Sequence, residues 1–177
     1  ILSMYSDELT ALMLEEKPIS EDMLHRIIRE QTIAREITPV LMGSAFKKKG
    51  IQPLLDAISR YMPSPLDRIT YARQNENEGA EIALSADPDA PTVAMAFKIV
   101  EESFGQLTFT RIYQGRLERG SIYFNSRAQK KQRISRIVRM HANDRKDIET
   151  AAAGDIVALI GVNCHSGDTI CSTSYNY

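Results

Sequence analysis

Basic residues are the side chains of this sequence with the clearest chemical potential, and they gather in one stretch of the chain. Six of them fall between positions 127 and 139, and three more lie between 111 and 119. They are Arg111, Arg116, Arg119, Arg127, Lys130, Lys131, Arg133, Arg136 and Arg139. Because the formal net charge of the chain is −1, this local excess of positive charge favours contact with a phosphate backbone. The alternative is an ordinary solvated strand face in a charge-rich protein.

Thiol and metal chemistry has little support in the sequence. Cys164 and His165 are adjacent, but Cys171 is the only further ligand type close to them, and the spacing is not that of a zinc site. No residue is recognisable as an activating base for either thiol. We therefore predict no catalytic residue and no metal site. Two cysteines so close together favour two free thiols in a reducing compartment, the cytoplasm, over a disulfide framework.

A lysine-rich segment bounded by Gly43 and Gly50 invites comparison with a phosphate-binding loop. It lacks the second glycine followed by Lys and Ser or Thr that a P-loop needs, so it cannot cradle β- and γ-phosphates by that route. The lysines at 47–49 are therefore expected to form a solvated helix start.

The first 66 residues have a helical pattern with one strand. One helix is predicted to begin at Ser6 and a second at Ser20, with apolar residues at helical spacing after each cap. His25 is expected to be a partly exposed helix residue. The apolar run 37–43 predicts a buried strand of a parallel sheet, followed by a loop at 44–46 and a helix over 51–62. This half of a βαβ unit would place a ligand at the loop.

From Thr92 the hydrophobic period changes to two. Thr92–Val100 is predicted to bury Val93, Met95, Phe97 and Ile99 on one face. The stretch 105–124 is predicted to be one β-hairpin with a turn between Gly115 and Gly120. Further strands are predicted over 132–140, with a bulge, and over 156–160 and 168–172. Short strands at this spacing suggest a small closed barrel.

The domain boundary is predicted at Pro63-Ser-Pro65, since these prolines stop the third helix. The fold class is therefore an α+β multidomain chain. It comprises the C-terminal part of an α/β domain at 1–66, a linker at 67–91 with one possible edge strand near 82–84, and an all-β barrel at 92–177. The chain has 177 residues and no run of apolar residues long enough to cross a membrane. It lacks an initiator Met and begins inside a hydrophobic pattern, which suggests a fragment of a larger protein.

Several motifs, in the right order, resemble bacterial elongation factor G. The segment 37–62 is similar to the end of the GTP-binding domain of that family. The runs Phe104–Gly115, Gln132–Asn143, Ala153–Asp155 and Ser166–Thr169 are similar to its second domain. The loop at 101–105 is shorter than in the family, and Asn163–Ser166 replaces its usual residues, which indicates a divergent branch.

This resemblance implies a translational GTPase that moves tRNA and mRNA on the ribosome. Gly43, Ser44, Ala45 and Phe46 would then form the guanine-base loop, with a backbone N–H donating to the guanine O6. The barrel would lie against small-subunit rRNA, and the contact candidates are Arg111, Arg116, Arg119, Lys130, Lys131, Arg133, Arg136 and Arg139. The resemblance implies GTP or GDP with Mg²⁺ in the full-length parent, none of them bound to this fragment, and neither membrane nor DNA as partner.

Other functions fit part of the same pattern. A related ribosome-acting GTPase of the ribosomal-protection or release-factor type would carry similar domains. A free-standing RNA-binding barrel would bind RNA with a steep salt dependence. A thiol enzyme using Cys164 and His165 would need a sharply lowered thiol pKa. Because the P-loop, the switches and the Asn-Lys-x-Asp motif are expected upstream of Ile1, we predict that the isolated chain does not hydrolyse GTP, which a turnover assay would check.

Overall fold

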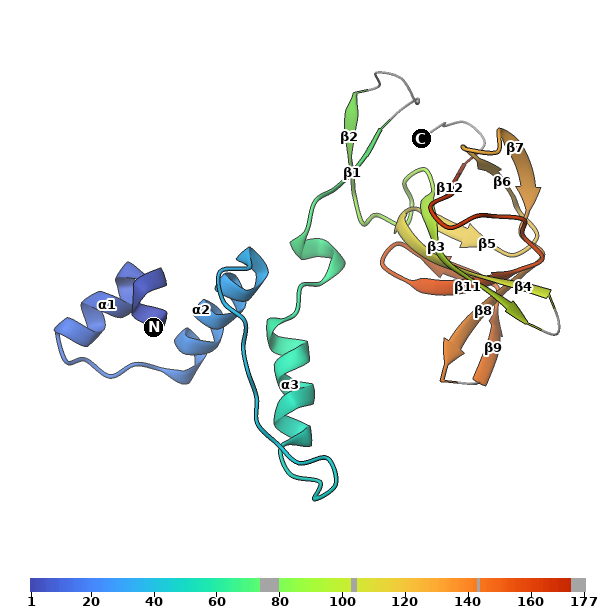
Figure 1. Cartoon of the computed structure of the whole chain (residues 1–177). Helices are drawn as coiled ribbons and strands as arrows, with labels where there is room; N and C mark the ends of the chain where they lie inside the picture. The colour runs from blue at the N-terminus through green and yellow to red at the C-terminus, as the bar shows by residue number, and fades with distance from the viewer. Residues whose placement is uncertain (74–79, 103–104, 143, 173–177) are drawn as a thin grey trace. The chain divides into compact units, whose positions relative to one another are not determined.

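The computed structural model describes residues 1–73, 80–102, 105–142 and 144–172 (Figure 1). The chain divides into two compact units, Ile1–Asp67 and Arg68–Tyr177. Three stretches that figured in the sequence argument lie outside the described residues: the polar run 74–79, part of the shortened loop at 103–104, and position 143.

The first unit is helical, and its helix starts are those predicted. It contains η1 (Leu2–Tyr5), α1 (Asp7–Leu14), α2 (Glu21–Ala34), α3 (Ile51–Tyr61) and η2 (Pro65–Asp67). The Ser6 hydroxyl accepts a hydrogen bond from the Leu9 N–H, and the Ser20 hydroxyl accepts one from the Met23 N–H, both at 3.2 Å. These caps satisfy N–H groups that have no partner inside the helix. Leu9, Met23 and Ile27 then pack into one small buried cluster.

His25 is half-buried on α2, as predicted. Its Nδ1 lies 2.6 Å from the Tyr61 hydroxyl, and Arg60 Nη1 lies 3.2 Å from its Nε2. Because a guanidinium can only donate, Nε2 is the acceptor and Nδ1 donates to the Tyr61 oxygen. The imidazole therefore joins α2 to α3 through hydrogen bonds.

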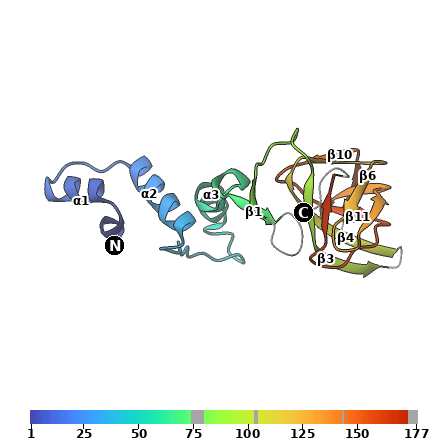
Figure 2. The same cartoon turned by 90° about the horizontal axis from the view of Figure 1, so that it is seen from above.

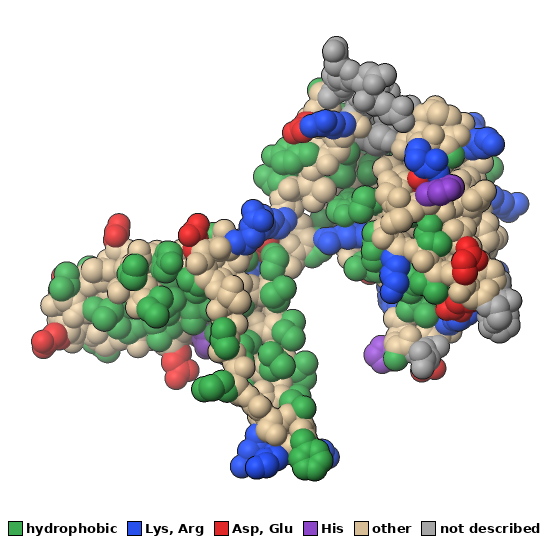
Figure 3. Space-filling model, viewed as in Figure 1, with side chains coloured by type: hydrophobic (Ala, Val, Ile, Leu, Met, Phe, Trp, Pro, Cys, Tyr) green, Lys and Arg blue, Asp and Glu red, His purple; other side chains and the backbone are tan. Residues whose placement is uncertain are grey.

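The prediction of a buried strand at 37–43 is wrong. This segment is extended but pairs with no other strand among the described residues, and Val40 and Met42 are 85% and 93% exposed. A run of apolar residues indicates that a segment tends to be buried. A strand also needs a neighbouring strand to accept and donate its backbone hydrogen bonds. Helix α3 forms as predicted, yet its apolar residues Ile51, Leu54, Leu55 and Ile58 are also exposed. Figure 3 shows hydrophobic side chains along this helix.

The segment 67–91, predicted as a linker with at most one edge strand, contains a hairpin. Strand β1 (Thr70–Arg73) pairs antiparallel with β2 (Glu81–Leu84). The end of the segment is tied to the barrel, since the Gly115 N–H donates to the Asp87 carbonyl at 2.8 Å and the Gln114 amide donates to the Pro91 carbonyl at 2.9 Å. The segment 67–91 therefore contains regular structure beyond the single edge strand that was expected, and its last residues are hydrogen-bonded to the barrel.

The second unit contains a β-barrel built from antiparallel pairs (Figures 1 and 2). Its main sheet has the strand order β7-β6-β12-β3-β4-β11-β8-β9, and a small sheet joins β10 to β5. The bounds are β3 (Val93–Glu102), β4 (Gly105–Gln114), β5 (Arg116–Glu118), β6 (Ile122–Asn125), β7 (Lys130–Arg133), β8 (Arg136–His141), β9 (Asp144–Ile148), β10 (Thr150–Ala152), β11 (Ile156–Ile160) and β12 (Thr169–Cys171). Strand β11 has the predicted bounds.

The core of the barrel departs from the predicted face of β3. Val93 is buried as predicted, but the fully buried side chains are Ala94 and Ala96, and Phe97 is 39% exposed. Two register shifts, between Val93 and Ala94 and between Ala96 and Lys98, explain the change, because each alters which side chains point inward. On β4 the side chains of Thr108, Thr110 and Ile112 are fully buried on one face, and Leu107 is buried on the other.

The hairpin predicted over 105–124 does not form. Strand β4 pairs with β3 and β11, and β6 pairs with β12 and β7, while β5 between them pairs with β10. Alternation identifies a strand and its faces but not its partner, which is decided by how the barrel closes. The bulged strand predicted at 132–140 is two strands, β7 and β8, separated by the buried Ile134. Strand β8 pairs antiparallel with β9.

Candidate nucleic-acid interface

Four of the predicted rRNA-contact arginines are already paired with carboxylates. Arg119 Nη1 lies 2.8 Å from Glu149 Oε1, Arg136 Nε lies 2.6 Å from Asp147 Oδ1, and Arg139 Nη2 lies 3.3 Å from Asp155 Oδ2. Arg116 forms an ion pair with Asp89. Figure 3 shows Lys and Arg side chains scattered over the visible surface of the barrel. These four guanidinium groups therefore have carboxylate partners within the fold.

Two further arginines have local roles within the fold. The guanidinium of Arg111 lies 5.1 Å from the centre of the Tyr113 ring, and its Nε is buried without a hydrogen-bond partner among the described residues. Arg133 Nε donates to the Gly120 carbonyl at 2.9 Å. Arg133 also lines a surface depression to which its strand, β7, contributes.

That depression, which we call the basic depression, has a volume of about 480 Å³. It is lined by Arg127, Ala128, Lys130, Lys131, Gln132, Arg133, Gly161, Asn163 and His165. Four of these side chains are cationic, and none of the described lining residues is acidic. The hairpin of β6 and β7 supplies one wall and the loop between β11 and β12 supplies the other. Of the eight predicted contact residues, three meet here: Lys130, Lys131 and Arg133.

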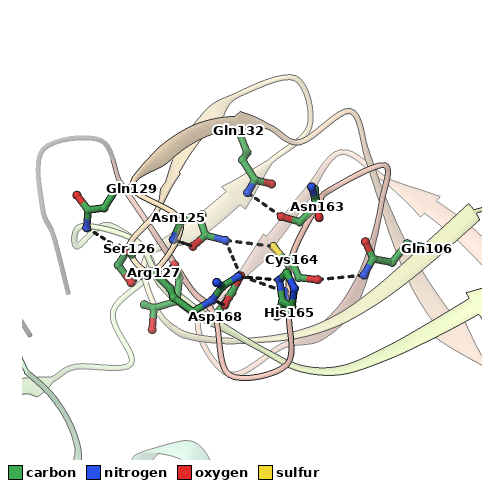
Figure 4. Close-up of polar contacts among 12 residues, drawn as sticks. Gln106, Asn125, Ser126, Arg127, Gln129, Gln132, Asn163, Cys164, His165 and Asp168 are labelled. Carbon is green, nitrogen blue, oxygen red and sulfur yellow. Dashed lines mark hydrogen bonds and ion pairs between the residues drawn. The ribbon is translucent and has the colours of Figure 1, made fainter.

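The buried carboxylate of Asp168 accepts hydrogen bonds from two residues that line the depression, Arg127 and His165 (Figure 4). Asp168 is 1% exposed. Its Oδ2 accepts hydrogen bonds from Asn125 Nδ2 at 2.7 Å and from the His165 backbone N–H at 3.0 Å. Arg127 completes the set, with Nε donating to Oδ1 and Nη2 donating to Oδ2 at 3.1 Å. A buried charge requires such partners to offset its desolvation.

The charge state of Asp168 follows from these contacts. Burial raises the pKa of the carboxyl, but the hydrogen bonds from Arg127, Asn125 and the His165 N–H together outweigh burial and lower the pKa to about 2. Asp168 is therefore ionised at neutral pH. The same contacts raise the pKa of Arg127, chiefly through its hydrogen bond to Asp168.

The loop carrying His165 is fixed by three contacts that Figure 4 shows. Gln132 Nε2 donates to the Asn163 carbonyl at 2.9 Å, and Gln106 Nε2 donates to the Cys164 carbonyl at 3.0 Å. Arg127 Nη2 lies 2.7 Å from His165 Nδ1. A guanidinium is only a donor, so Nδ1 is the acceptor in this hydrogen bond. Sequence reasoning missed Asn163, His165 and the role of Arg127, because the contacts join residues far apart along the chain.

Thiol chemistry is not supported at this site. Both cysteines are buried thiols that form no disulfide. Burial, together with the nearby charge of Asp168, raises the pKa of the Cys164 thiol to about 11. A reactive cysteine requires the opposite shift. Within the described ranges no group of three His, Cys, Asp or Glu side chains is arranged to hold a metal ion.

The predicted guanine-base loop is a tight turn in the first unit. The Ser44 N–H donates to the Lys49 carbonyl at 2.9 Å, and the Lys49 N–H donates to the Ser44 carbonyl at 3.0 Å. The Lys48 N–H donates to the Ala45 carbonyl, and the Lys47 N–H to the Ser44 hydroxyl. Across the described part of the chain, the N–H groups of Ala45 and Phe46 have no acceptor, so they are the donors that this turn leaves available.

Two glycines allow this turn to close. A Cβ at Gly43 would lie 2.8 Å from the Lys49 carbonyl oxygen, and one at Gly50 would lie 2.9 Å from the Met42 carbonyl oxygen. Gly50 also has a φ of +78°, which other residues adopt at a cost.

Among the helices of the described residues, none is both long and apolar enough to cross a lipid bilayer.

Comparison with known proteins finds relatives that align with both units of the chain. Residues 105–171 match the family described as elongation factor Tu domain 2. The chain is 56% identical over 171 residues to elongation factor G of Rhodopirellula baltica, and 48% identical over 176 residues to elongation factor G 1 of Borreliella afzelii. It is 44% identical over 176 residues to the mitochondrial elongation factor G-1 of Arabidopsis thaliana.

These alignments include 97% to 99% of the chain but 23% to 25% of the relatives, so the chain spans about a quarter of their length. A crystal structure of a protein from Thermus thermophilus is similar in fold, with a TM-score of 0.69 at 22% identity. The match covers 97% of this chain and 23% of the Thermus thermophilus chain.

Proposed function

Since this chain corresponds to a segment of bacterial elongation factor G, we propose that it serves in a ribosomal translocase as the end of the GTP-binding domain and the barrel that follows it. The observation that carries the proposal is the 56% identity to an elongation factor G over 97% of the chain. In the full-length protein, GTP hydrolysis would move tRNA and mRNA during protein synthesis in the cytoplasm. The domain division into 1–66, 67–91 and 92–177 is part of this proposal.

The first unit would contribute to guanine recognition through Gly43, Ser44, Ala45 and Phe46. The available N–H groups of Ala45 and Phe46 support this role, because guanine O6 is an acceptor and adenine presents an amino group at the same position. The turn therefore fits the edge of a guanine base. In the parent protein, bound GTP with Mg²⁺ would supply the phosphate chemistry. We assign none of the residues discussed here a role in that chemistry.

The barrel would contact small-subunit rRNA. The cations of the basic depression, of which Arg127 is paired with Asp168, support this partner, since RNA presents a regular array of phosphates. Arg116, Arg119, Arg136 and Arg139 have weaker support, because each is already within an ion pair.

The experiment that tests the proposal uses the full-length protein that contains this segment. We expect ribosome-stimulated GTP turnover, and movement of the ribosome by one codon in a toeprinting assay on a complex carrying two tRNAs. Release of antibiotic from the ribosome, or splitting of subunits without codon movement, would instead identify a ribosomal-protection or release-factor type of GTPase. Failure of any ribosome dependence would reject the proposal.

Guanine recognition has its own test. In the full-length protein, GDP should bind more tightly than an analogue that lacks O6, and Ala45→Pro, which removes one N–H donor, should reduce that preference. Lys48→Gln changes the same turn without removing a backbone donor and is the matched control. Equal binding of the two nucleotides by the unaltered protein would contradict the assigned role.

A further inference from the structure

We infer that a groove between α2 and α3, in the first unit, is a binding site for an apolar α-amino acid. Asp56 would meet the ammonium group of this ligand and Arg60 would meet its carboxylate. The groove takes part in none of the roles proposed above, so the inference does not depend on the proposed function. It assigns a ligand to side chains that the helical unit leaves without partners.

The groove, which we call the α2–α3 groove, has the size and composition of a small-molecule site. Its volume is about 620 Å³, and its walls are η1, α2, α3 and the extended segment that joins the two helices (Figure 1). Eight of its twelve lining residues are apolar, among them Ile28, Ile37, Pro39 and Ala57, and the other four are polar or charged. Sites for small molecules are typically apolar hollows of this volume in which a few polar groups converge.

Two opposite charges lie one helical turn apart on the α3 wall. Asp56 and Arg60 both line the groove, and neither side chain is in an ion pair with another described residue. Side chains four positions apart on a helix are neighbours, with Cβ atoms about 5 to 6 Å from each other, and opposite charges at this spacing often pair. Arg60 is instead turned toward α2, where its Nη1 lies 3.2 Å from His25 Nε2. The wall therefore presents one anion and one cation that are both open to a ligand.

Arg60 is held in position by His25 while most of its donors stay available. Its Nε and Nη2 have no acceptor among the described residues. Because His25 Nδ1 donates to the Tyr61 oxygen at 2.6 Å, the Tyr61 hydroxyl keeps its own proton for another acceptor. A carboxylate can thus accept from the free edge of the guanidinium and from this hydroxyl, and charge-assisted hydrogen bonds of this kind are the strong ones.

The pair of charges distinguishes an amino acid from other apolar ligands. An apolar monocarboxylic acid would bring its negative charge close to Asp56 with nothing to offset the repulsion, and an apolar amine would do the same beside Arg60. An uncharged apolar molecule would cover both side chains without pairing them, which is costly for buried charges. An α-amino acid carries both charges on one carbon and turns its side chain toward the apolar walls.

The test measures amide chemical shifts of the isotope-labelled 177-residue chain by NMR during titration with L-phenylalanine. We expect saturable shifts in α2, α3 and the segment 37–41, with a dissociation constant of about 10⁻⁴ to 10⁻³ M. Two matched ligands each lack one charge: hydrocinnamate has no ammonium group and phenethylamine has no carboxylate. Each should bind about five to ten times more weakly than phenylalanine.

Two variants assign the charges to their side chains. Arg60→Gln should weaken phenylalanine binding about fivefold or more and leave the binding of phenethylamine unchanged. Asp56→Asn should also weaken phenylalanine binding, but it should not weaken the binding of hydrocinnamate. This crossed pattern separates loss of a contact from loss of folding, because an unfolded variant would bind none of the ligands. Arg26→Gln is the control, since Arg26 lies on α2 in an exposed ion pair with Glu8 and does not line the groove. It should change the affinity less than about twofold.

Several results would overturn the inference. They are the absence of saturable shifts up to about 10 mM phenylalanine, ten times the weakest expected dissociation constant, equal affinities for the three ligands, and equal effects of Arg26→Gln and Arg60→Gln. The test needs neither ribosomes nor GTP, so its failure would leave the translocase proposal intact. Likewise, a full-length protein that failed to move the ribosome would not affect the assignment of the groove.

Discussion

Asn125 and Asp168 meet inside the barrel, where Asn125 Nδ2 donates to Asp168 Oδ2 at 2.7 Å. The two residues are 43 positions apart and both are 1% exposed. Asn125 Oδ1 also accepts from the Ala128 N–H at 2.9 Å, so the same amide fixes the turn that carries Arg127. This pair thus links the interior of the barrel to the wall of the basic depression.

Replacing Asp168 by Asn should lower the free energy of unfolding by about 2 to 3 kcal/mol. The substitution keeps the shape but turns one acceptor oxygen into a donor, which then faces Asn125, Arg127 or the His165 N–H with no acceptor available. Urea denaturation followed by circular dichroism measures the change. Asp147→Asn, in the exposed pair with Arg136, is the control and should cost less than about 1 kcal/mol. Similar losses in the two variants would contradict the role of the buried network.

Acid should remove the stabilisation that Asp168 provides. Its pKa in the folded chain is about 2, below its ordinary value of 3.8, so the folded state favours the ionised form. The stabilising effect is complete above about pH 4 and is lost as the pH falls through about 2, with a total of about 2 kcal/mol. Unfolding measured between about pH 5 and about pH 2 should show the chain and its Asp168→Asn variant converging in stability. A constant difference over that range would show that the pKa is not lowered.

The Cys164 thiol should be unreactive in the folded chain. Its pKa of about 11 leaves almost no thiolate at neutral pH, and burial blocks access to the sulfur. We expect alkylation by iodoacetamide near neutral pH, followed by mass spectrometry, to be at least about a hundredfold slower in the native chain than in urea. Rapid native labelling of Cys164 would instead support the thiol-enzyme alternative.

Gly115 should be the most sensitive glycine of the barrel. It has a φ of +73°, and a Cβ there would lie 2.6 Å from both the Ala90 carbonyl oxygen and Thr92 Cα. Because these are backbone atoms, they cannot move aside easily, and Gly115→Ala should destabilise the chain by about 3 kcal/mol or more. Gly120→Ala is the control, since its φ is +84° but its nearest contact is an arginine side-chain atom at 3.8 Å. It should cost about 1 to 2 kcal/mol. Thermal unfolding of both variants compares the two costs.

Local signals in the sequence were sufficient where the physical cause is local. Ser6 and Ser20 cap helices because their hydroxyls reach N–H groups three residues later. The bounds of β11 follow from a short apolar run between turn signals, which needs no knowledge of the partner strand. The family resemblance likewise depended on ordered motifs that are visible without coordinates.

The sequence alone did not identify which strands pair with one another. The run 37–43 has the composition of a buried strand but no strand beside it in the described residues, and β4 pairs with β3 and β11 rather than with the strand after its turn. Each pairing depends on the closure of the sheet and on the two register shifts in β3, neither of which has a local sequence signal.

At the candidate site, too, the sequence determines one part and the tertiary structure decides the other. The order of the residues is enough to establish that basic side chains are concentrated between positions 111 and 139 of a chain with almost no net charge. Which of them are neutralised depends on folding, because Glu149, Asp147 and Asp155 reach Arg119, Arg136 and Arg139 from other segments of the barrel. Folding also brings His165 and Asp168 to Arg127, since ion pairs and hydrogen bonds depend on distances in space and not on separation along the chain.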